Sequence, residues 1–307
     1  MSRPSETLLD LSLSTAVVDR AAHGRRDPEL LPQLLADPGT RVLDLRGDRV
    51  LVVADGERPR VRLRPPEQPD RDALVLYLGR DGEHTAYLAV VRDPWEQPDE
   101  AQWPTLRQVG PQLDDRDAGL FTAALALGNW HASHPRCPRC GTATVPREGG
   151  WVRHCPQDGS DHFPRTDVAV IMAVTDEQDR LLLARGPQWA TARGSVLAGF
   201  VEPGETLEAA VAREVQEEVG LAVTDVTYRG NQPWPFPSSL MVGFTARAEG
   251  TVLTLDSVEI AEADWFTREE LRTRVEAGDL GLPSRLSIAR RLIEDWYGAP
   301  LSGPRAL

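Results

Sequence analysis

A chain of 307 residues is long for a single domain, so its length predicts at least two. With 41% hydrophobic and 26% charged residues it has the composition of a soluble globular protein, and the absence of a long apolar run excludes a membrane span. A formal net charge of −13 argues against an extended nucleic-acid-binding surface, although a single phosphorylated end could still be held at a metal.

Residues 1–112 are predicted to form a β-rich domain without a chemical motif. Dipeptides Asp55-Gly56 and Asp81-Gly82 are typical of hairpin turns between short apolar runs. The expected strands are Arg41–Leu45, Arg49–Ala54, Arg60–Arg64, Ala73–Leu78 and Thr85–Val91.

Residues 113–165 are predicted to contain a connecting helix and a zinc ribbon. Asp114 or Asp115 can cap a helix through Gly119–Trp130. A C-x2-C motif is then followed, after fourteen residues, by C-x2-D, which resembles zinc-ribbon spacing with one ligand changed. The predicted zinc ligands are Cys137, Cys140, Cys155 and Asp158.

The sequence leaves the identity of the fourth zinc ligand undecided, because zinc accepts carboxylate oxygen as well as imidazole. Asp158 is the first choice, His154 and His162 are rivals, and a metal-free ribbon is the alternative. A closed tetrahedral site has no free position, so one structural Zn²⁺ per subunit is expected. Three cysteines cannot form a disulfide framework, and the N-terminal residues do not resemble a signal peptide, so a cytoplasmic protein is expected.

Residues 166–298 alternate strand and helix patterns, and residues 299–307 are expected to be a tail. Apolar periodicity predicts strands at Val168–Val174, Arg180–Ala184, Asp225–Arg229 and Leu240–Ala248, and a final helix at Ser287–Tyr297. Between the second and third of these strands, Thr206 can cap a helix through Leu207–Val219 that ends at Gly220. The whole chain is therefore predicted to be of the α+β class.

Glu214, Glu217 and Glu218 stand at i, i+3 and i+4 and project from one face of this helix. Like charges this close repel, and a divalent cation relieves the repulsion because Mg²⁺ prefers oxygen ligands. Arg213 is placed to orient a carboxylate. The alternative is a solvated acidic face.

The residue spacing from Gly199 to Leu221 favours a metal site over a solvated acidic face. It fits G-x5-E-x7-R-E-U-x-E-E-x-G-U, where U is apolar, at every position, and it resembles the Nudix box of hydrolases that cleave substituted nucleoside diphosphates. The matching residues are Gly199, Glu205, Arg213, Glu214, Val215, Glu217, Glu218, Gly220 and Leu221.

A second motif, Gln232-Pro-Trp-Pro-Phe-Pro-Ser-Ser239, presents two aromatic rings on a backbone stiffened by proline. Together with the box and the ribbon, it resembles the NADH pyrophosphatase branch of the Nudix family, whose NudC-type members also remove NAD caps from RNA. This resemblance covers most of the chain. It implies a C-terminal Nudix α/β/α sandwich around a mixed sheet, a central zinc ribbon and a β-rich N-terminal domain.

The resemblance also implies residue roles. Glu214, Glu217, Glu218 and Glu259 would hold catalytic Mg²⁺ or Mn²⁺, with Glu218 the most important and Glu217 the alternative base. Phe200 would stack on the nicotinamide side, and Phe163 would reach the pocket across a homodimer interface. The other implied substrate-binding residues are Gln232, Trp234, Phe236, Ser239 and Ala289. Three positions depart from the family pattern: Asp158, Asn231 and Phe163.

The implied reaction is hydrolysis of the pyrophosphate of NAD(H), or of an NAD cap on an RNA 5′ end, to NMN(H) and a 5′-monophosphate. Bound divalent ions would neutralise charge on the phosphates and lower the pKa of water. One alternative is a Nudix hydrolase of another nucleotide such as ADP-ribose. Another is a non-catalytic nucleotide sensor or zinc-ribbon adaptor, in which box glutamates should be missing.

Overall fold

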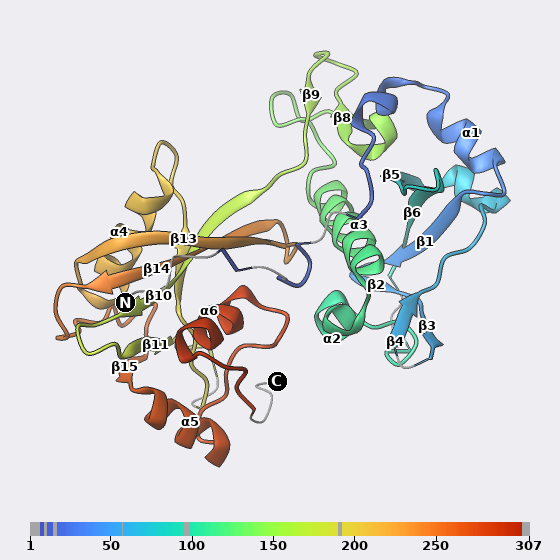
Figure 1. The fold of residues 1–307 in the computed structure, drawn as a ribbon. Coiled ribbons are helices and arrows are strands. Elements are labelled where there is room, and N and C mark those ends of the chain that lie inside the picture. Colours follow the sequence, from blue (N-terminus) through green and yellow to red (C-terminus); the bar gives the residue numbers. More distant parts are fainter. Residues whose placement is uncertain are drawn as a thin grey trace. The chain divides into compact units, whose positions relative to one another are not determined.

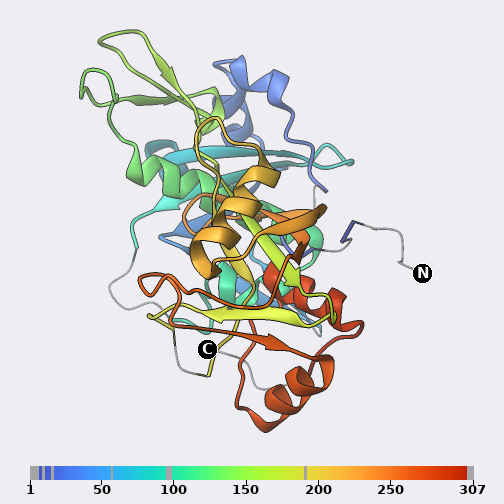
Figure 2. The same ribbon diagram turned by 90° about the vertical axis from the view of Figure 1, so that its left-hand side faces the viewer.

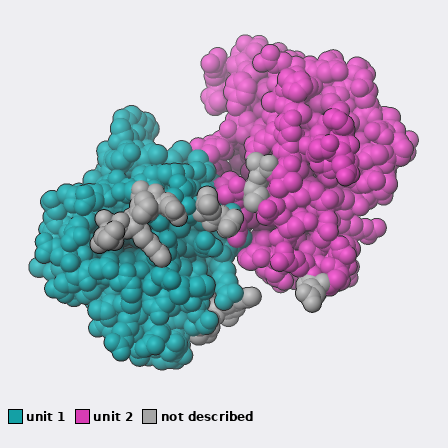
Figure 3. Space-filling model, viewed as in Figure 1, with its two compact units in different colours: residues 1–11, 167–232, 239–307 teal, residues 12–166, 233–238 magenta. Residues whose placement is uncertain are grey.

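The computed structural model describes residues 7–8, 11–14, 17–56, 58–94, 99–189 and 192–302. Internal contacts divide the chain into two compact units, teal and magenta in Figure 3. Unit 1 comprises residues 1–11, 167–232 and 239–307, and unit 2 comprises residues 12–166 and 233–238. The short segment 233–238 thus belongs with unit 2, although it interrupts the sequence of unit 1. No helix among the described residues is long and apolar enough to cross a bilayer.

A four-stranded sheet with the order β2-β1-β6-β5 forms the centre of unit 2 (Figure 1). Its strands are β1 (Arg41–Arg46), β2 (Arg49–Val50), β5 (Leu74–Arg80) and β6 (Ala86–Arg92). Strand β6 runs parallel to β1 and antiparallel to β5. Helix α3 (Asp115–Ser133) packs on this sheet. Gly128 permits the contact, because a Cβ there would lie 2.7 Å from Leu45 Cδ2.

Three of the five predicted strands of unit 2 are confirmed, and two differ in detail. The strand predicted at Arg60–Arg64 lies at Arg58–Val61. The run Arg49–Ala54 is divided between two sheets, because Val50 pairs with Leu45 whereas Val52 pairs with Val61. The Asp114 cap of α3 is confirmed, since its side chain accepts a hydrogen bond from the Asp117 N–H. The remaining elements of this part are β3 (Val52–Asp55), β4 (Arg58–Val61), α1 (Leu30–Ala36), α2 (Leu106–Val109) and the 3-10 helices η1 (Ala22–Arg26), η2 (Gln68–Asp72) and η3 (Gly110–Gln112).

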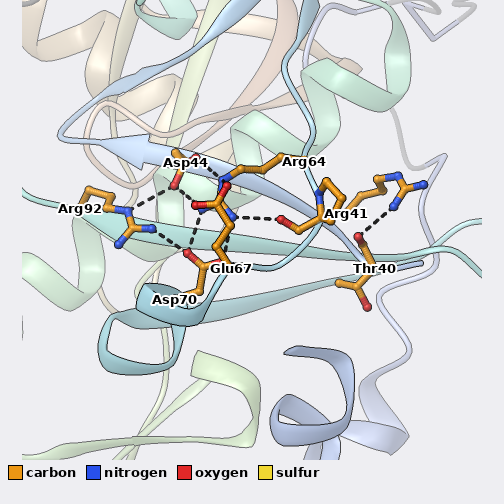
Figure 4. A network of polar contacts seen from close by, with 8 residues as sticks. Thr40, Arg41, Asp44, Arg64, Glu67, Asp70 and Arg92 are labelled. Atoms are coloured by element: carbon orange, nitrogen blue, oxygen red, sulfur yellow. Dashed lines mark hydrogen bonds and ion pairs between the residues drawn. The ribbon is translucent and has the colours of Figure 1, made fainter. Parts of the chain in front are cut away.

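A network of ion pairs ties η2 to the sheet of unit 2 (Figure 4). Arg64 contacts Asp44 and Asp70 at 2.7 Å each, and Arg92 contacts the same two carboxylates at 3.2 and 2.6 Å. Burial alone would raise the pKa of Asp70, but hydrogen bonds from Arg64 and the Glu67 N–H lower it overall. Two shared carboxylates between two arginines satisfy the buried charges, which indicates a structural role.

The zinc-ribbon segment forms a three-stranded antiparallel sheet of β7 (Val145–Arg147), β8 (Val152–His154) and β9 (Asp161–His162), with η4 (Glu148–Gly150) between the first two strands. Buried His131 of α3 joins the helix to it through Gly150 O at 2.8 Å and Arg153 Nη1 at 2.7 Å. Arginine only donates, so His131 Nδ1 accepts and Nε2–H donates to Gly150. Burial lowers the pKa of His131 to about 4, which keeps this neutral tautomer near neutral pH.

Unit 1 contains a six-stranded mixed sheet with the path β13-β14-β10-β11-β15, and β12 pairs with β10. Strand β10 is parallel to β14 and antiparallel to β11 and β12. Its strands are β10 (Asp167–Thr175), β11 (Leu181–Arg185), β12 (Leu197–Phe200), β13 (Val223–Trp234), β14 (Ser239–Ala248) and β15 (Glu262–Phe266).

Alternating residues of β10 divide the core of unit 1 into two layers. Ile171 and Ala173 pack with α5 (Arg268–Ala277) and α6 (Ile288–Tyr297), whereas Val170 and Met172 pack with α4 (Leu207–Val219). Period-two alternation sends neighbouring side chains to opposite faces of the sheet. The predicted α/β/α sandwich is therefore confirmed, with α4 on one face and α5 and α6 on the other (Figure 1 and Figure 2).

Helix α4 begins and ends at the predicted residues. The Thr206 side chain accepts a hydrogen bond from the Ala209 N–H at 3.2 Å, and Gly220 ends the helix in the left-handed region with φ 73°. Val211 and Val215 of its apolar stripe are fully buried. The fold thus fixes which face of α4, and so which of its glutamates, points inward.

Candidate active site

Two of the three predicted α4 carboxylates are buried. Glu214 is 8% exposed and Glu218 is 7% exposed, whereas the Glu217 side chain is 59% exposed. The Oε2 atom of Glu218 is buried and has no hydrogen-bond partner. A buried, unpaired carboxylate oxygen is costly unless a cation compensates it.

Mutual repulsion adds to this cost. The pKa of Glu218 is raised to about 8, first by burial and then by the charges of Glu214, Glu259 and Glu217. Burial also raises the pKa of Glu214, while a hydrogen bond from Arg213 opposes the shift. Glu259, predicted from the family resemblance, acts on both buried groups. The four carboxylates therefore form one interacting cluster.

Arg213 orients three carboxylates next to Glu218. Its Nη1 donates to Glu214 Oε1 at 2.8 Å and to Glu217 Oε2 at 2.9 Å, and its Nε and Nη2 bind both oxygens of Glu205. The same guanidinium donates to the carbonyl of Phe200 at 2.8 Å. Glu218 receives none of these bonds, so the arginine fixes the geometry around it without neutralising it.

Gly199 of β12 leaves the space that the Glu214 carboxylate fills. A Cβ at this position would lie 1.8 Å from the Glu214 carboxyl carbon and 2.1 Å from each of its oxygens. The pairing of Gly199 with Val170 of β10 holds the strand at this distance. The glycine of the motif is therefore required by a side-chain contact across the site.

We expect Gly199→Ala to remain folded but to lose turnover by about a hundredfold, because a displacement of about 1 Å at a catalytic group has that effect. The melting temperature and the hydrolysis rate measured together separate the two effects. Gly82→Ala is the matched control, since a Cβ there meets no atom within 4 Å. Wild-type turnover in Gly199→Ala would contradict this account of the contact.

A turn after β14 brings Glu259 to the end of α4. The Asp256 N–H donates to Glu218 O at 3.1 Å, and the Glu259 N–H donates to Asp256 O at 3.1 Å. These backbone bonds link the position of Glu259 to the last turn of the helix. An all-carboxylate donor set with an unpaired buried oxygen fits a hard divalent cation such as Mg²⁺ or Mn²⁺.

The ribbon residues form the second candidate metal site. The ligand atoms of Cys137, Cys140, Cys155 and Asp158 all lie within 4.8 Å of one another. Among the residues that the structure describes no other set of ligand atoms gathers in this way, so the carboxylates of Glu214, Glu218 and Glu259 are less closely grouped than the ribbon ligands. Cys140 Sγ and Cys155 Sγ are 3.5 Å apart, and Cys137 Sγ and Asp158 Oδ2 are 3.3 Å apart. Two thiolates about 2.3 Å from one tetrahedral zinc would be separated by about 3.8 Å. The cluster therefore fits a structural zinc.

Of the three candidates for the fourth zinc ligand, Asp158 is the one that lies in this cluster. Ser160 donates its Oγ–H and N–H to Asp158 Oδ1, which lowers the pKa of this carboxyl and leaves Oδ2 facing Cys137. His154 Nδ1 instead pairs with Asp161 Oδ1 at 2.7 Å, and His162 Nε2 lies 3.1 Å from Ser160 Oγ.

The predicted substrate residues divide between the two units. Phe200 of unit 1 is 60% exposed, and Phe163 of unit 2 is 68% exposed, so both rings are open to a ligand. Trp234 and Phe236 belong to unit 2 and are half-buried. Ser239 begins β14 and is also half-buried.

Gln232 and Ala289 are buried instead. Gln232 is fully buried, its Nε2 donates to Leu286 O at 2.7 Å, and its Oε1 accepts from the Ile288 N–H at 2.8 Å. Its carboxamide thereby holds the start of α6. Ala289 is 3% exposed within the α6 layer. The predicted substrate contacts of these two residues stay predictions.

Sandwich and carboxylate cluster together define a Nudix domain. The chain matches the family described as NUDIX domain over residues 165–285, the NADH pyrophosphatase zinc ribbon domain over residues 132–163, and the NADH pyrophosphatase-like rudimentary NUDIX domain over residues 39–130.

Relatives match across almost the whole chain. "NAD-capped RNA hydrolase NudC" of Mycobacterium bovis (strain BCG / Pasteur 1173P2) is 41% identical over 298 residues, covering 92% of this chain and 94% of the relative. The protein of the same name from Mycobacterium tuberculosis H37Rv is 40% identical with the same coverage, and that of Deinococcus radiodurans is 42% identical over 72% of this chain and 76% of its own length. The chain belongs to the NudC-type NADH pyrophosphatase family of Nudix hydrolases.

Proposed function

We propose that this protein hydrolyses the pyrophosphate bond of NAD(H) to NMN(H) and AMP, and that it removes NAD caps from RNA 5′ ends. The observation that carries the proposal is the buried pair Glu214 and Glu218, with an unpaired oxygen on Glu218, in a member of this family. A non-catalytic sensor is disfavoured, because every glutamate of the box is present.

Glu214, Glu218 and Glu259 would hold the catalytic Mg²⁺ or Mn²⁺. The bound ions would neutralise charge on the phosphate oxygens and make water more acidic. Arg213 orients the carboxylates of Glu205, Glu214 and Glu217 by bridging all three.

The water oxygen forms a bond to one phosphorus, and the bond from that phosphorus to the bridging oxygen breaks. The leaving phosphate keeps the electron pair, and one of the two protons of the water passes to a carboxylate. Glu217 suits this role because it is the exposed member of the three and Arg213 fixes its Oε2 at 2.9 Å. Glu218 organises the same side of the site.

Exposed and half-buried aromatic rings would recognise the bases. Phe200, Phe163, Trp234 and Phe236 offer faces on which nicotinamide or adenine can stack. We further propose a homodimer in which the partner subunit supplies Phe163 to the pocket. The thiols of the zinc cluster, which are free of disulfides, suit a reducing cytoplasm.

Product analysis tests the proposed function. With Mn²⁺, NADH should yield NMNH and AMP, and NAD-capped RNA should yield NMN and 5′-monophosphate RNA, while chelation should stop both reactions. ADP-ribose and the two substrates are compared at equal concentration. Faster cleavage of ADP-ribose than of either NAD substrate, or binding without cleavage, would contradict the proposal.

A further inference from the structure

The Pro-rich segment 233–238 is bound by the Asn129 side chain of unit 2. Asn129 of α3 donates from Nδ2 to Pro235 O and to Pro237 O, both at 3.1 Å. A carboxamide nitrogen carries two hydrogens, so each carbonyl receives one. Proline has no N–H of its own, so the segment is rich in acceptors and poor in donors. Asn129 supplies the two donors that the segment lacks.

A cation covers the two rings of the same segment. The Arg107 guanidinium of α2 lies 3.9 Å from the centre of the Phe236 ring and 5.0 Å from that of Trp234. The two rings meet edge to face at 4.9 Å. Cation–π contacts of this kind act within about 6 Å. The guanidinium therefore restricts the motion of both rings, and the contact between the two rings restricts it further.

We infer that Arg107 and Asn129 are positioning residues for substrate recognition, acting through Trp234 and Phe236. Both lie within residues 39–130, the match to the rudimentary NUDIX domain, in which the sequence shows no chemical motif. This inference rests on the proposed function, because that proposal has the two rings contact a base. The rudimentary NUDIX domain thus has a role in recognition, because it holds the aromatic segment.

The residues inferred to position the aromatic rings and the residues that would bind the metal belong to different units. Arg107, Asn129 and the aromatic segment belong to unit 2, whereas Glu214 and Glu218 belong to unit 1. Loosening the segment should therefore weaken substrate binding without disturbing the carboxylates. The signature is a rise in KM with little change in kcat.

Two variants test the assignment. Asn129→Asp keeps the shape but replaces the donor by an oxygen beside two carbonyl oxygens, and Arg107→Met removes the charge. Each should raise KM for NADH by roughly tenfold, the effect of losing about two hydrogen bonds or one cation–π contact, with kcat within about twofold. Arg107→Lys should recover most of the loss. Arg46→Met is the matched control, because Arg46 covers Trp103 elsewhere in unit 2.

A double-mutant cycle and hydrogen exchange show whether the two residues act through the segment. In a Trp234→Ala, Phe236→Ala background, Arg107→Met should have no further effect on KM. Amide exchange in a peptide spanning residues 230–240 should be faster in Asn129→Asp and Arg107→Met than in wild type and Arg46→Met. Unchanged KM with unchanged exchange, or a fall in kcat with the loss of Mn²⁺-induced stabilisation, would overturn the inference. Inactive wild-type protein would instead overturn the proposed function, and the exchange measurement would still decide the anchoring.

Discussion

Glu218→Gln should lower NADH turnover at least about a hundredfold while the protein remains folded. Glutamine keeps the size of the side chain but removes the negative charge that the buried site requires. Glu208→Gln is the control, because Glu208 is an exposed glutamate on the same helix. Steady-state kinetics with NADH and Mn²⁺ measure the effect. Glu217→Gln should also slow turnover, but without the loss of metal binding expected for Glu218→Gln.

The same substitution should stabilise the metal-free protein at alkaline pH. The pKa of Glu218 is about 8 in the folded state against an ordinary value of 4.5, so its contribution to stability is present below pH 4.5 and is lost as the pH rises through 8. Glutamine has no such loss. At about 1.4 kcal/mol per pKa unit, the variant should exceed wild type by a few kcal/mol in the free energy of unfolding above pH 8.

Melting curves in EDTA and in Mn²⁺, at about pH 5 and about pH 9, measure this effect. In EDTA the advantage of Glu218→Gln should grow with pH. In Mn²⁺ the order should reverse, because the ion stabilises the wild-type cluster by binding only the folded state. Identical curves for the two proteins under all four conditions would show that Glu218 is neither strained nor a ligand.

Loss of zinc should have the second large effect, on the stability of unit 2. The ribbon strands are two or three residues long, and the fully buried Cys155 directly follows β8. Such short strands cannot form an apolar core, and structural zinc sites supply about 10–16 kcal/mol of folding free energy in isolated fingers. Chelation or Cys155→Ser should therefore unfold the ribbon, as fast amide exchange in residues 137–162 would reveal.

Zinc content distinguishes the rival fourth ligands. Asp158→Asn should weaken zinc binding, because an amide oxygen lacks the charge of the carboxylate, whereas Asp158→Cys should retain the metal. His162→Ala and His154→Ala should bind zinc like wild type, since neither imidazole lies in the cluster. Full zinc occupancy in Asp158→Asn together with its loss in His162→Ala would assign the ligand to the histidine.

Local rules explain why the sequence predicts α4 so well. Thr206 caps the helix, Gly220 ends it in a conformation that favours glycine, and the valines between them recur at helical spacing. The same rules locate α6 between Ser287 and Gly298. A capping box at Thr267 and Glu270 is the local pattern that could have predicted α5.

Long-range contacts are what the sequence could not supply. The closeness of Gly199 to Glu214 depends on how β12 pairs with β10, which no local pattern encodes. The anchoring of Pro235 and Pro237 by Asn129 joins residues more than a hundred positions apart. The sequence therefore predicted the chemistry of the candidate site, while the tertiary contacts explain its geometry.

Diffraction from crystals of the protein soaked in Mn²⁺ tests the central claim most directly. Anomalous difference maps should show manganese bound by Glu214 and Glu218, with Glu259 beside it, and no manganese in crystals of Glu218→Gln. An empty carboxylate cluster in the wild-type crystals, under conditions in which the protein is folded, would contradict the account.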